Sequence, residues 1–297
     1  MIPRYPVFKK LELSDRDAVE AHTARLPPYS DFEFGNLWSW DVKGEMRLSE
    51  LNGNLVVRFT DYQTGRPLLT FLGTHDAAKT ARSLLEDVPK AEDRSLHLIA
   101  AEAAVAIEGG GFVVEPSYDH LDYICEVARH LDYHGAGLKA QRRNVRRFME
   151  LAPGAEYIEL DLMTREAQAD IRAVCERWIA HKGSSGTSEP RAIERFLAAA
   201  GSIPHAAVGI RLDVALIAFH IASLAPGICA NALFSKADAA YRGVYAALDQ
   251  AVAHDLLSRG YARLNLQQDL GIKGLRCAKQ SLKPSMVLRK YSVRLRT

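Results

Sequence analysis

The stretch AAVGIRLDVALIAFHIASLAPGICANALFSKADAAYRGVYAALDQAVAHDLLSRGYARLNL, residues 206–266, holds one complete series of secondary-structure elements. Its alternating or continuous apolar runs predict three strands, at 206–211, 214–223 and 228–234. An apolar stripe at helical spacing predicts a long helix over 239–259, and this stripe comprises Val244, Leu248, Val252 and Leu256. Gly260 follows the helix, and 262–266 predict the next strand. The predicted order is therefore three strands, a long helix and one more strand.

Similar elements come before this stretch. A helix is predicted over 14–25 with Ser14 as its N-cap. Four strands and two helices follow it, with the strands at 55–59, 68–72, 96–100 and 112–116 and the helices at 76–87 and 101–111. The second half opens with a strand at 157–161 and helices at 165–180 and 189–200. We therefore predict an α+β protein with two tandem halves, 1–135 and 136–297, each a mixed, mostly antiparallel sheet flanked by helices.

Charge is distributed unevenly along the chain. The 297 residues are 48% hydrophobic and 25% charged, which is ordinary for a globular protein, and the formal net charge is only +2. Residues 270–297 carry eight Lys or Arg and no acid, so the remainder of the chain is net negative. A locally basic end on a mildly acidic body predicts a local anion site and not a surface coated for nucleic acid.

Cysteine usage and hydropathy narrow the class of protein. The four cysteines are far apart, with no CxxC pair and no Cys/His cluster, so we expect neither a disulfide framework nor a bound metal. The N-terminus lacks the apolar core of a signal peptide. The longest apolar tract, 203–234, is interrupted by charged residues and a proline, which predicts strands and not a membrane span. We therefore expect a cytoplasmic protein.

Two basic segments are candidates for binding anions. The first lies within residues 139–147 and comprises Lys139, Arg142, Arg143, Arg146 and Arg147. On a helix these cations share one face, which predicts contact with the phosphates of a nucleic acid, and the alternative is a solvated helix face. The second segment contains Arg276, Lys279 and Lys283, and glycines at 271 and 274 with Pro284 predict a loop between them. The alternative there is a terminal strand with solvated ends.

Histidines are weaker candidates. His220 alternates with apolar residues inside a predicted strand, so a core histidine is expected there and not a catalytic base. No nucleophile elbow, phosphate-binding P-loop or dinucleotide-binding glycine motif is present in the sequence.

The element order of 206–266 is similar to that of acyl-CoA N-acyltransferases, the GNAT fold. In that fold the loop before the long helix holds the pyrophosphate of coenzyme A and carries the signature Q/R-x-x-G-x-G/A. If Arg242 is taken as its first residue, the required glycine falls on Tyr245, so the signature fails. The resemblance therefore implies GNAT-like halves but disfavours coenzyme A as donor, while Tyr241 and Arg242 at this helix start stay candidates for binding substrate.

Three further stretches resemble one family. They are LPPYSDFEFGNLWSWD (26–41), YDHLDYICEVARHL with LKAQRRNVRRF (118–148), and NLQQDLGIKGLRCAKQSLKPSMVLRKY (265–291). They are similar to motifs of the C-terminal domain of bacterial lysyl-phosphatidylglycerol synthases and of its free-standing soluble relatives. The likeness spans most of the chain and is most specific at the C-terminus. The family's fold is two tandem acyltransferase-like halves, which agrees with the predicted organisation.

The resemblance implies transfer of an aminoacyl group from aminoacyl-tRNA to an amine or hydroxyl of a soluble acceptor. It implies no cofactor, since aminoacyl-tRNA is the donor. The sequence shows no membrane segment, so we expect a small molecule or peptide as acceptor, with a membrane lipid disfavoured. The catalytic candidates are Asp269, Arg276 and Lys279. The substrate-binding candidates in the same motif are Asn265, Gln267, Ser281 and Lys283.

One motif position departs from the family. Gln267 stands where the family often has Glu, so a general base of the relatives is missing here, which favours an amine acceptor. Two alternatives stay open: a coenzyme A-dependent N-acyltransferase, with a coenzyme A thioester as donor, and a non-catalytic module that binds an anion or RNA. An enzyme needs a closed cavity beside Arg276, whereas a binding module needs only a basic face.

Overall fold

The structure is a computed structural model, and it describes residues 1–61, 65–89, 93–182 and 188–296. The chain forms two compact units, and each unit combines segments that are distant in sequence. Unit 1 consists of Met1–Asp122, Gln268–Lys273 and Val287–Thr297. Unit 2 consists of Tyr123–Gln267 and Gly274–Met286. The division of the chain at 135/136 stays a prediction. The two compact units do not correspond to two continuous halves, because unit 1 contains segments from both ends of the sequence.

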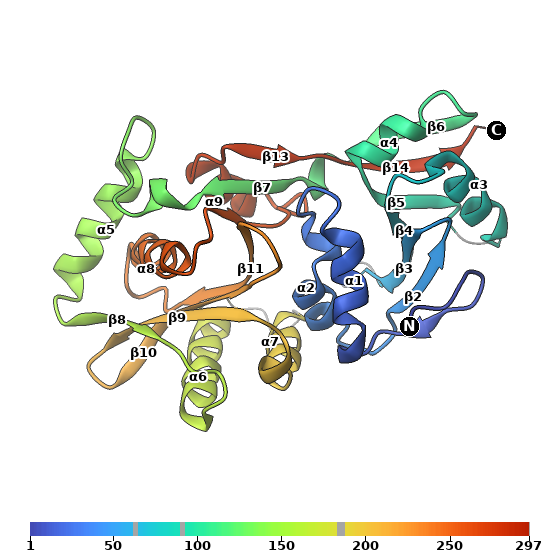
Figure 1. Cartoon of the computed structure of the whole chain (residues 1–297). Helices are drawn as coiled ribbons and strands as arrows, with labels where there is room; N and C mark the ends of the chain where they lie inside the picture. Colours follow the sequence, from blue (N-terminus) through green and yellow to red (C-terminus); the bar gives the residue numbers. More distant parts are fainter. Residues whose placement is uncertain (62–64, 90–92, 183–187, 297) are drawn as a thin grey trace. The chain divides into compact units, whose positions relative to one another are not determined.

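Unit 1 is built on a seven-stranded sheet with the order β1-β2-β3-β4-β5-β14-β6 (Figure 1). Its strands are β1 (Lys9–Lys10), β2 (Arg47–Leu51), β3 (Asn54–Thr60), β4 (Pro67–Leu72), β5 (Ser95–Ala100), β14 (Lys290–Leu295) and β6 (Phe112–Pro116). Only β4 and β5 pair in parallel among these described strands. The last strand of the chain thus lies between two strands from the first half.

Helices cover the sheet of unit 1. They are α1 (Arg16–Thr23), α2 (Phe34–Trp40), α3 (Ala77–Asp87) and α4 (Ala101–Ile107). Leu84 of α3 and Ala103 of α4 pack with Val56, Phe71 and Val293 of the sheet in one apolar cluster. Burial of such side chains is the main stabilising contribution to a fold of this kind.

Unit 2 contains a second seven-stranded sheet, with the order β13-β7-β12-β11-β10-β9-β8. Its strands are β13 (Met286–Leu288), β7 (Asp122–Glu126), β12 (Arg263–Asn265), β11 (Cys229–Ala237), β10 (Ala215–Ser223), β9 (His205–Leu212) and β8 (Ala155–Glu159). The β11–β12 pair is parallel, and the pairs from β12 to β7 and from β11 through β8 are antiparallel.

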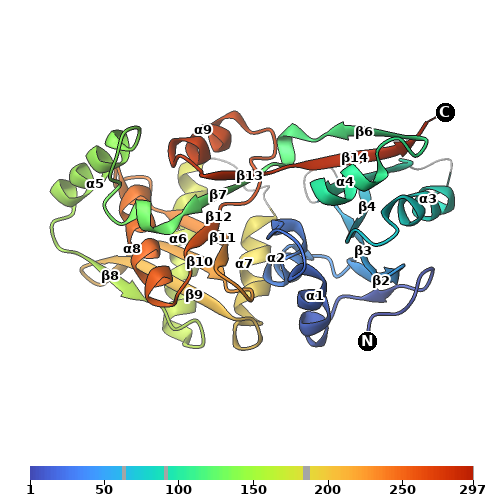
Figure 2. The same ribbon diagram turned by 45° about the horizontal axis from the view of Figure 1, so that its top comes forward.

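Five helices belong to the described part of unit 2. They are α5 (Lys139–Leu151), α6 (Arg165–Lys182), α7 (Glu189–Leu197), α8 (Val244–Ser258) and α9 (Lys273–Ser281). Figures 1 and 2 show α8 on one face of the sheet and α6 on the other. The apolar stripe of α8, with Leu248 and Val252, packs on Val208 of β9, Ala230 of β11 and Phe148 of α5. No helix within the described ranges is long and apolar enough to span a lipid bilayer.

The predicted fold class is confirmed: the protein is α+β, with two mixed, mostly antiparallel sheets. The three strands, long helix and strand of 206–266 are present as β9, β10, β11, α8 and β12. The predicted loop between the C-terminal basic residues is wrong, because Lys273–Ser281 form α9. Gly271 does adopt a left-handed backbone, with φ of 71°, but Gly274 lies inside the helix. Strand β2, helix α2 and strand β7 are elements that the sequence patterns did not predict.

Candidate functional site

The segment that leaves β12 contains the first two predicted substrate-binding residues. Asn265 ends the strand and is buried, and its Oδ1 accepts a hydrogen bond of 2.7 Å from the backbone N–H of Gln267. This bond stabilises a sharp turn in which Gln267 has a left-handed φ of 62°. The Gln267 side-chain nitrogen is buried and has no hydrogen-bond partner among the described residues. A buried amide donor without a partner is costly, so it is a candidate for contacting a substrate carbonyl.

Asp269 lies in unit 1 and is fully buried. Its Oδ1 accepts a hydrogen bond of 2.9 Å from the N–H of Gly271. A Cβ at Gly271 would lie 3.0 Å from the Asp119 carboxyl carbon, so a larger residue would be crowded there. The geometry gives Asp269 a role in shaping this turn, and its catalytic role stays a prediction.

The other two predicted catalytic residues lie on α9. Arg276 and Lys279 are three residues apart and therefore on one side of the helix, and both are partly exposed. The Lys279 ammonium donates a hydrogen bond of 2.5 Å to the backbone oxygen of Leu266, just beyond β12. Lys279 thus fixes α9 against the end of the strand.

Ser281 joins α9 to α5. Its Oγ donates to the Ala278 oxygen at 2.7 Å and accepts from the Gln141 side-chain amide at 2.9 Å. Lys283 comes two residues later, is exposed, and lies against Gly137, where a Cβ would be 3.1 Å from the lysine Cε. The structure therefore brings Asn265, Lys279 and Ser281 to neighbouring parts of unit 2.

The start of α8 differs from a coenzyme A site. Tyr241 packs against the core of unit 2, and Arg242 is exposed. Gly243 has φ of 91°, and a Cβ there would lie 2.1 Å from the backbone oxygen of Asn144 in α5. Helix α5 is therefore packed directly on the beginning of α8. A pyrophosphate at this helix start would have to displace α5, which weighs against coenzyme A as donor.

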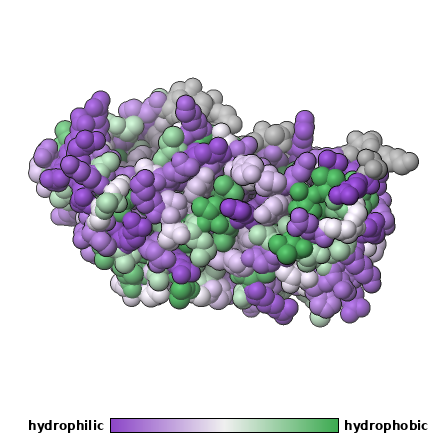
Figure 3. Space-filling view, turned by 90° about the horizontal axis from the view of Figure 1, so that it is seen from above, coloured by the Kyte–Doolittle hydropathy of each residue, from purple (hydrophilic) through white to green (hydrophobic). Residues whose placement is uncertain are grey.

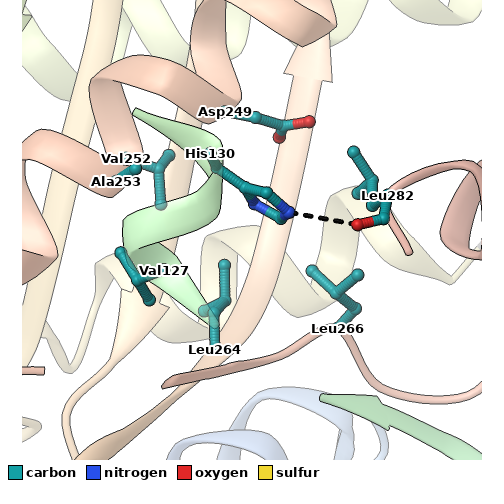
Figure 4. A pocket seen from close by; sticks show the side chains of 8 residues that line it. All are labelled: Val127, His130, Asp249, Val252, Ala253, Leu264, Leu266 and Leu282. Carbon is teal, nitrogen blue, oxygen red and sulfur yellow. Dashed lines mark hydrogen bonds between the residues drawn. The ribbon is translucent and has the colours of Figure 1, made fainter. Parts of the chain in front are cut away.

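A small pocket lies inside unit 2, and two residues of the stretch 265–291, Leu266 and Leu282, line it (Figure 4). It is lined by apolar side chains from η4 (Val127–His130), α8 and β12, together with Leu282. The His130 Nε2 donates a hydrogen bond of 3.3 Å to the Leu282 oxygen, and burial lowers the pKa of His130. Leu266 and Leu282 in the pocket wall each have a bonded backbone oxygen. The oxygen of Leu266 accepts from Lys279, and that of Leu282 accepts from His130.

Asp249 is the acidic group of this pocket. Burial raises the pKa of its carboxyl group to about 7, although a hydrogen bond of 3.4 Å from the Tyr133 hydroxyl works in the opposite direction. A carboxyl group of this kind exchanges its proton near neutral pH. Asp249 was not among the residues predicted from the sequence to be functional. An acid on the apolar face of α8, three residues before Val252, is the feature that could have indicated it.

Unit 1 contains a buried ionic cluster, which sequence reasoning also missed. The Lys290 ammonium, fully buried, forms ion pairs with Asp122 at 2.8 Å and with Asp31. The Asp122 carboxylate also accepts from the N–H and the hydroxyl of Ser30, each at 2.7 Å. The side-chain amide of Gln268 donates to Asp31. Residues from all three family-like stretches thus meet at one buried site.

The pKa values in this cluster follow its charge balance. Burial alone lowers the pKa of Lys290, but the carboxylates of Asp122 and Asp31 outweigh it and raise that pKa. Burial also raises the pKa of Asp31, with Lys290 working against it and Asp122 adding to it. One cation thus faces two acids, and the net effect is a pKa of Asp31 above its ordinary value.

The predicted nucleic-acid-binding residues lie on α5. Four have exposed side chains: Lys139, Arg143, Arg146 and Arg147. None of these four forms an ion pair with any residue in the described ranges. Arg142 is different, because its guanidinium donates to the backbone oxygens of Tyr133 and Gly135, the latter at 3.2 Å. The part of unit 2 that carries α5 has a mostly hydrophilic surface in Figure 3.

The fold defines a class, α+β proteins built on two mixed seven-stranded sheets. The chain belongs to the family described as phosphatidylglycerol lysyltransferase, C-terminal, whose model matches residues 23–294. The resemblance inferred from the motifs is therefore confirmed.

Three solved structures are similar to the whole chain. A conserved protein of unknown function from Bacteroides thetaiotaomicron has 25% identity and a TM-score of 0.83, over 99% of this chain and 100% of that chain. L-PGS from Bacillus licheniformis has 16% identity and a TM-score of 0.64, over 97% and 94% of the two chains. FemX has 12% identity and a TM-score of 0.61, over 97% of each chain. The last two show the shared fold alone. A search of curated proteins found no match.

Proposed function

We propose that the protein transfers an aminoacyl group from aminoacyl-tRNA to an amine or hydroxyl of a soluble acceptor. The observation that carries the proposal is membership of the phosphatidylglycerol lysyltransferase C-terminal family over residues 23–294. The most family-like stretch, 265–291, runs from the end of β12 through the turn that follows it, α9 and β13 to the start of β14. The proposal places the donor end of the tRNA at this segment.

Two groups on α9 supply the chemistry. Arg276 offers a planar fork that fits the oxygens of a phosphate, such as that of the terminal adenosine. A cation or N–H donor beside the ester would stabilise the oxyanion that forms when the acceptor attacks, and one such donor contributes about 3–4 kcal/mol in known enzymes. Lys279 lies about one helical turn after Arg276, and its ammonium donates a hydrogen bond to the backbone oxygen of Leu266. Gln267 supplies no base, which favours a primary amine as acceptor, because an amine needs a base less than a hydroxyl does.

The test of this function is a transfer assay. The purified protein is incubated with a mixture of tRNAs charged with labelled amino acids and a set of amine-bearing small molecules and peptides. We expect label to move to an acceptor, and ribonuclease treatment of the tRNA to abolish the transfer. Transfer that needs a coenzyme A thioester and not RNA would support the N-acyltransferase alternative. Binding of RNA without any transfer would support the binding-module alternative.

The exposed cations of α5 give a separate prediction. If they contact tRNA phosphates, Arg143→Gln with Arg147→Gln weakens tRNA binding and reduces its salt dependence. Each lost phosphate contact should lower the slope of log K against log salt by roughly 0.7–0.9. The measurement is a binding titration at several salt concentrations. A matched control replaces two exposed arginines of unit 2 outside α5, Arg165 and Arg191, with Gln. Equal slopes for the two double variants would leave α5 a solvated helix face.

A further inference from the structure

Helix α5 has two sides with different environments. Its outer side carries the four exposed cations that form no ion pair within the described ranges. Its inner side carries Gln141 and Phe148, which are buried, and Phe148 belongs to the core of unit 2. The beginning of the helix is fixed by Arg142, which donates to the backbone oxygens of Tyr133 and Gly135. A ligand on the outer side would therefore act on a helix that is in firm contact with the interior.

Gln141 connects this helix to α9. Its side-chain nitrogen donates to the Ser281 hydroxyl at 2.9 Å, and its side-chain oxygen accepts from the Asn144 amide at 3.3 Å. The Ser281 hydroxyl donates its own hydrogen bond to the Ala278 oxygen at 2.7 Å, so toward Gln141 it acts as the acceptor. Both ends of the Gln141 amide are thus engaged, and its orientation is fixed.

The position of α9 depends on such polar contacts. No residue of α9, which is described along its whole length, is fully buried, so the helix is not anchored by an apolar core of its own. The contacts that hold it within unit 2 include the Lys279 bond to Leu266, the Gln141 bond to Ser281 and, just beyond its end, the His130 bond to Leu282. Of these three contacts, the one from Gln141 comes from the helix that bears the exposed cations.

We propose that Gln141 is a positioning residue that couples RNA binding on the outer side of α5 to the position of α9 and hence of Arg276. This inference rests on the proposed function. A tRNA bound to the exposed cations restricts the motion of α5, and Gln141 transmits that restriction to Ser281, the last residue of the helix that carries Arg276 and Lys279. The donor RNA itself then orders the helix that acts on its terminal ester.

Hydrogen exchange tests the coupling without relying on transfer. Amide exchange is followed in wild-type protein and in Gln141→Leu, with and without uncharged tRNA. Leucine fills a similar volume but cannot donate to Ser281. We expect tRNA to slow exchange in both α5 and residues 274–282 of the wild type, and only in α5 of the variant. Protection of α5 alone in the wild type would overturn the coupling while RNA binding stands. No protection in either segment would overturn the coupling together with the proposed function.

Single-turnover transfer at saturating charged tRNA is the second measurement. We expect Gln141→Leu to slow transfer about five- to tenfold, which is the typical effect of losing one hydrogen bond, with the tRNA Kd unchanged within about twofold. Ser281→Ala should slow it similarly, and the double variant should be no slower than the slower single variant. Gln280→Leu, an exposed glutamine on the same helix, is the matched control. A normal rate for Gln141→Leu, or multiplying effects in the double variant, would contradict a direct bond with a positioning role.

Discussion

Lys290→Met is expected to lower the free energy of unfolding by about 3–5 kcal/mol, which is the typical cost of removing one partner from a buried ion pair. The Lys290 side chain is fully buried and holds the carboxylates of Asp122 and Asp31. Methionine keeps most of the volume but removes the ammonium that pairs with both buried acids. Two of their other partners, Ser30 and Gln268, donate hydrogen bonds but carry no charge. Chemical denaturation followed by circular dichroism measures the loss.

The loss of unfolding free energy in Lys290→Met should become larger as the pH rises. Burial already raises the pKa of Asp31 above its usual value, so the folded protein binds this proton more tightly than the unfolded chain does. A group of this kind makes the protein less stable as the pH rises from the unfolded pKa toward the folded one. Lys290 lowers the pKa of Asp31 in the folded protein, so that pKa rises further when Lys290 is removed. The deficit of Lys290→Met relative to wild type should therefore be larger at pH 8 than at pH 5.

Two variants serve as controls for this prediction. Lys10→Met removes an exposed lysine of the same unit and should change stability by less than about 0.5 kcal/mol. Adding Asp31→Asn to Lys290→Met removes one of the two uncompensated charges and should restore part of the loss. If Lys290→Met is as stable as wild type at both pH values, the ammonium does not balance these acids.

The burial of Lys290 and its pairing with two acids could not be predicted from the sequence. The excess of basic residues after Asp269 predicts an anion site, and every one of those cations is equivalent in a charge count. Lys290 is nevertheless internal, because its partners Asp31 and Asp122 come from segments far away in the chain. A pattern of charges along the sequence describes local composition. It does not show which distant residues will pack against a given charge in the fold. The motifs containing these three residues were recognised, but their meeting in one cluster could be seen only in three dimensions.

The fold was predicted well where local patterns determine it. The stripe of α8 and the apolar runs of β9, β10 and β11 follow directly from periodicity. Periodicity does not name the partner of a strand, however, and so it gave no indication that β14 lies between β5 and β6. Helix α9 was predicted as a loop because Gly271 and Gly274 were given more weight than the good helix formers at 275–280. Only Gly271 uses the left-handed backbone that favours glycine.

The candidate site was predicted by resemblance more than by pattern. Asn265, Lys279 and Ser281 lie in neighbouring parts of unit 2, where the motif placed them together in sequence. The pocket acid Asp249 was missed because it is a single carboxylate on a helix face that was read for its apolar residues. Gln141 was missed for a similar reason. Its five basic neighbours dominate the stretch, and a buried glutamine gives no signal in a sequence.

Arg276→Ala is expected to slow aminoacyl transfer about 10- to 150-fold without unfolding the protein. A hydrogen bond to a charged group contributes about 1.5–3 kcal/mol, and each 1.36 kcal/mol corresponds to a factor of ten in rate. Arg276 is partly exposed on α9, on the same side as Lys279, which is the position from which the proposed function requires it to meet a phosphate or an ester oxygen. The measurements are single-turnover transfer from charged tRNA and thermal melting of each variant.

Arg276→Lys separates the charge of this residue from its geometry. Lysine keeps the positive charge but loses the planar fork, so we expect transfer to stay impaired, although less than in Arg276→Ala. Lys273→Ala, an exposed cation at the start of the same helix, is the matched control and should transfer at the wild-type rate with an unchanged melting temperature. Normal transfer by Arg276→Ala would move the donor site away from α9. A large drop in its melting temperature would instead make Arg276 a structural residue, because the loss of transfer would then follow from the loss of the fold.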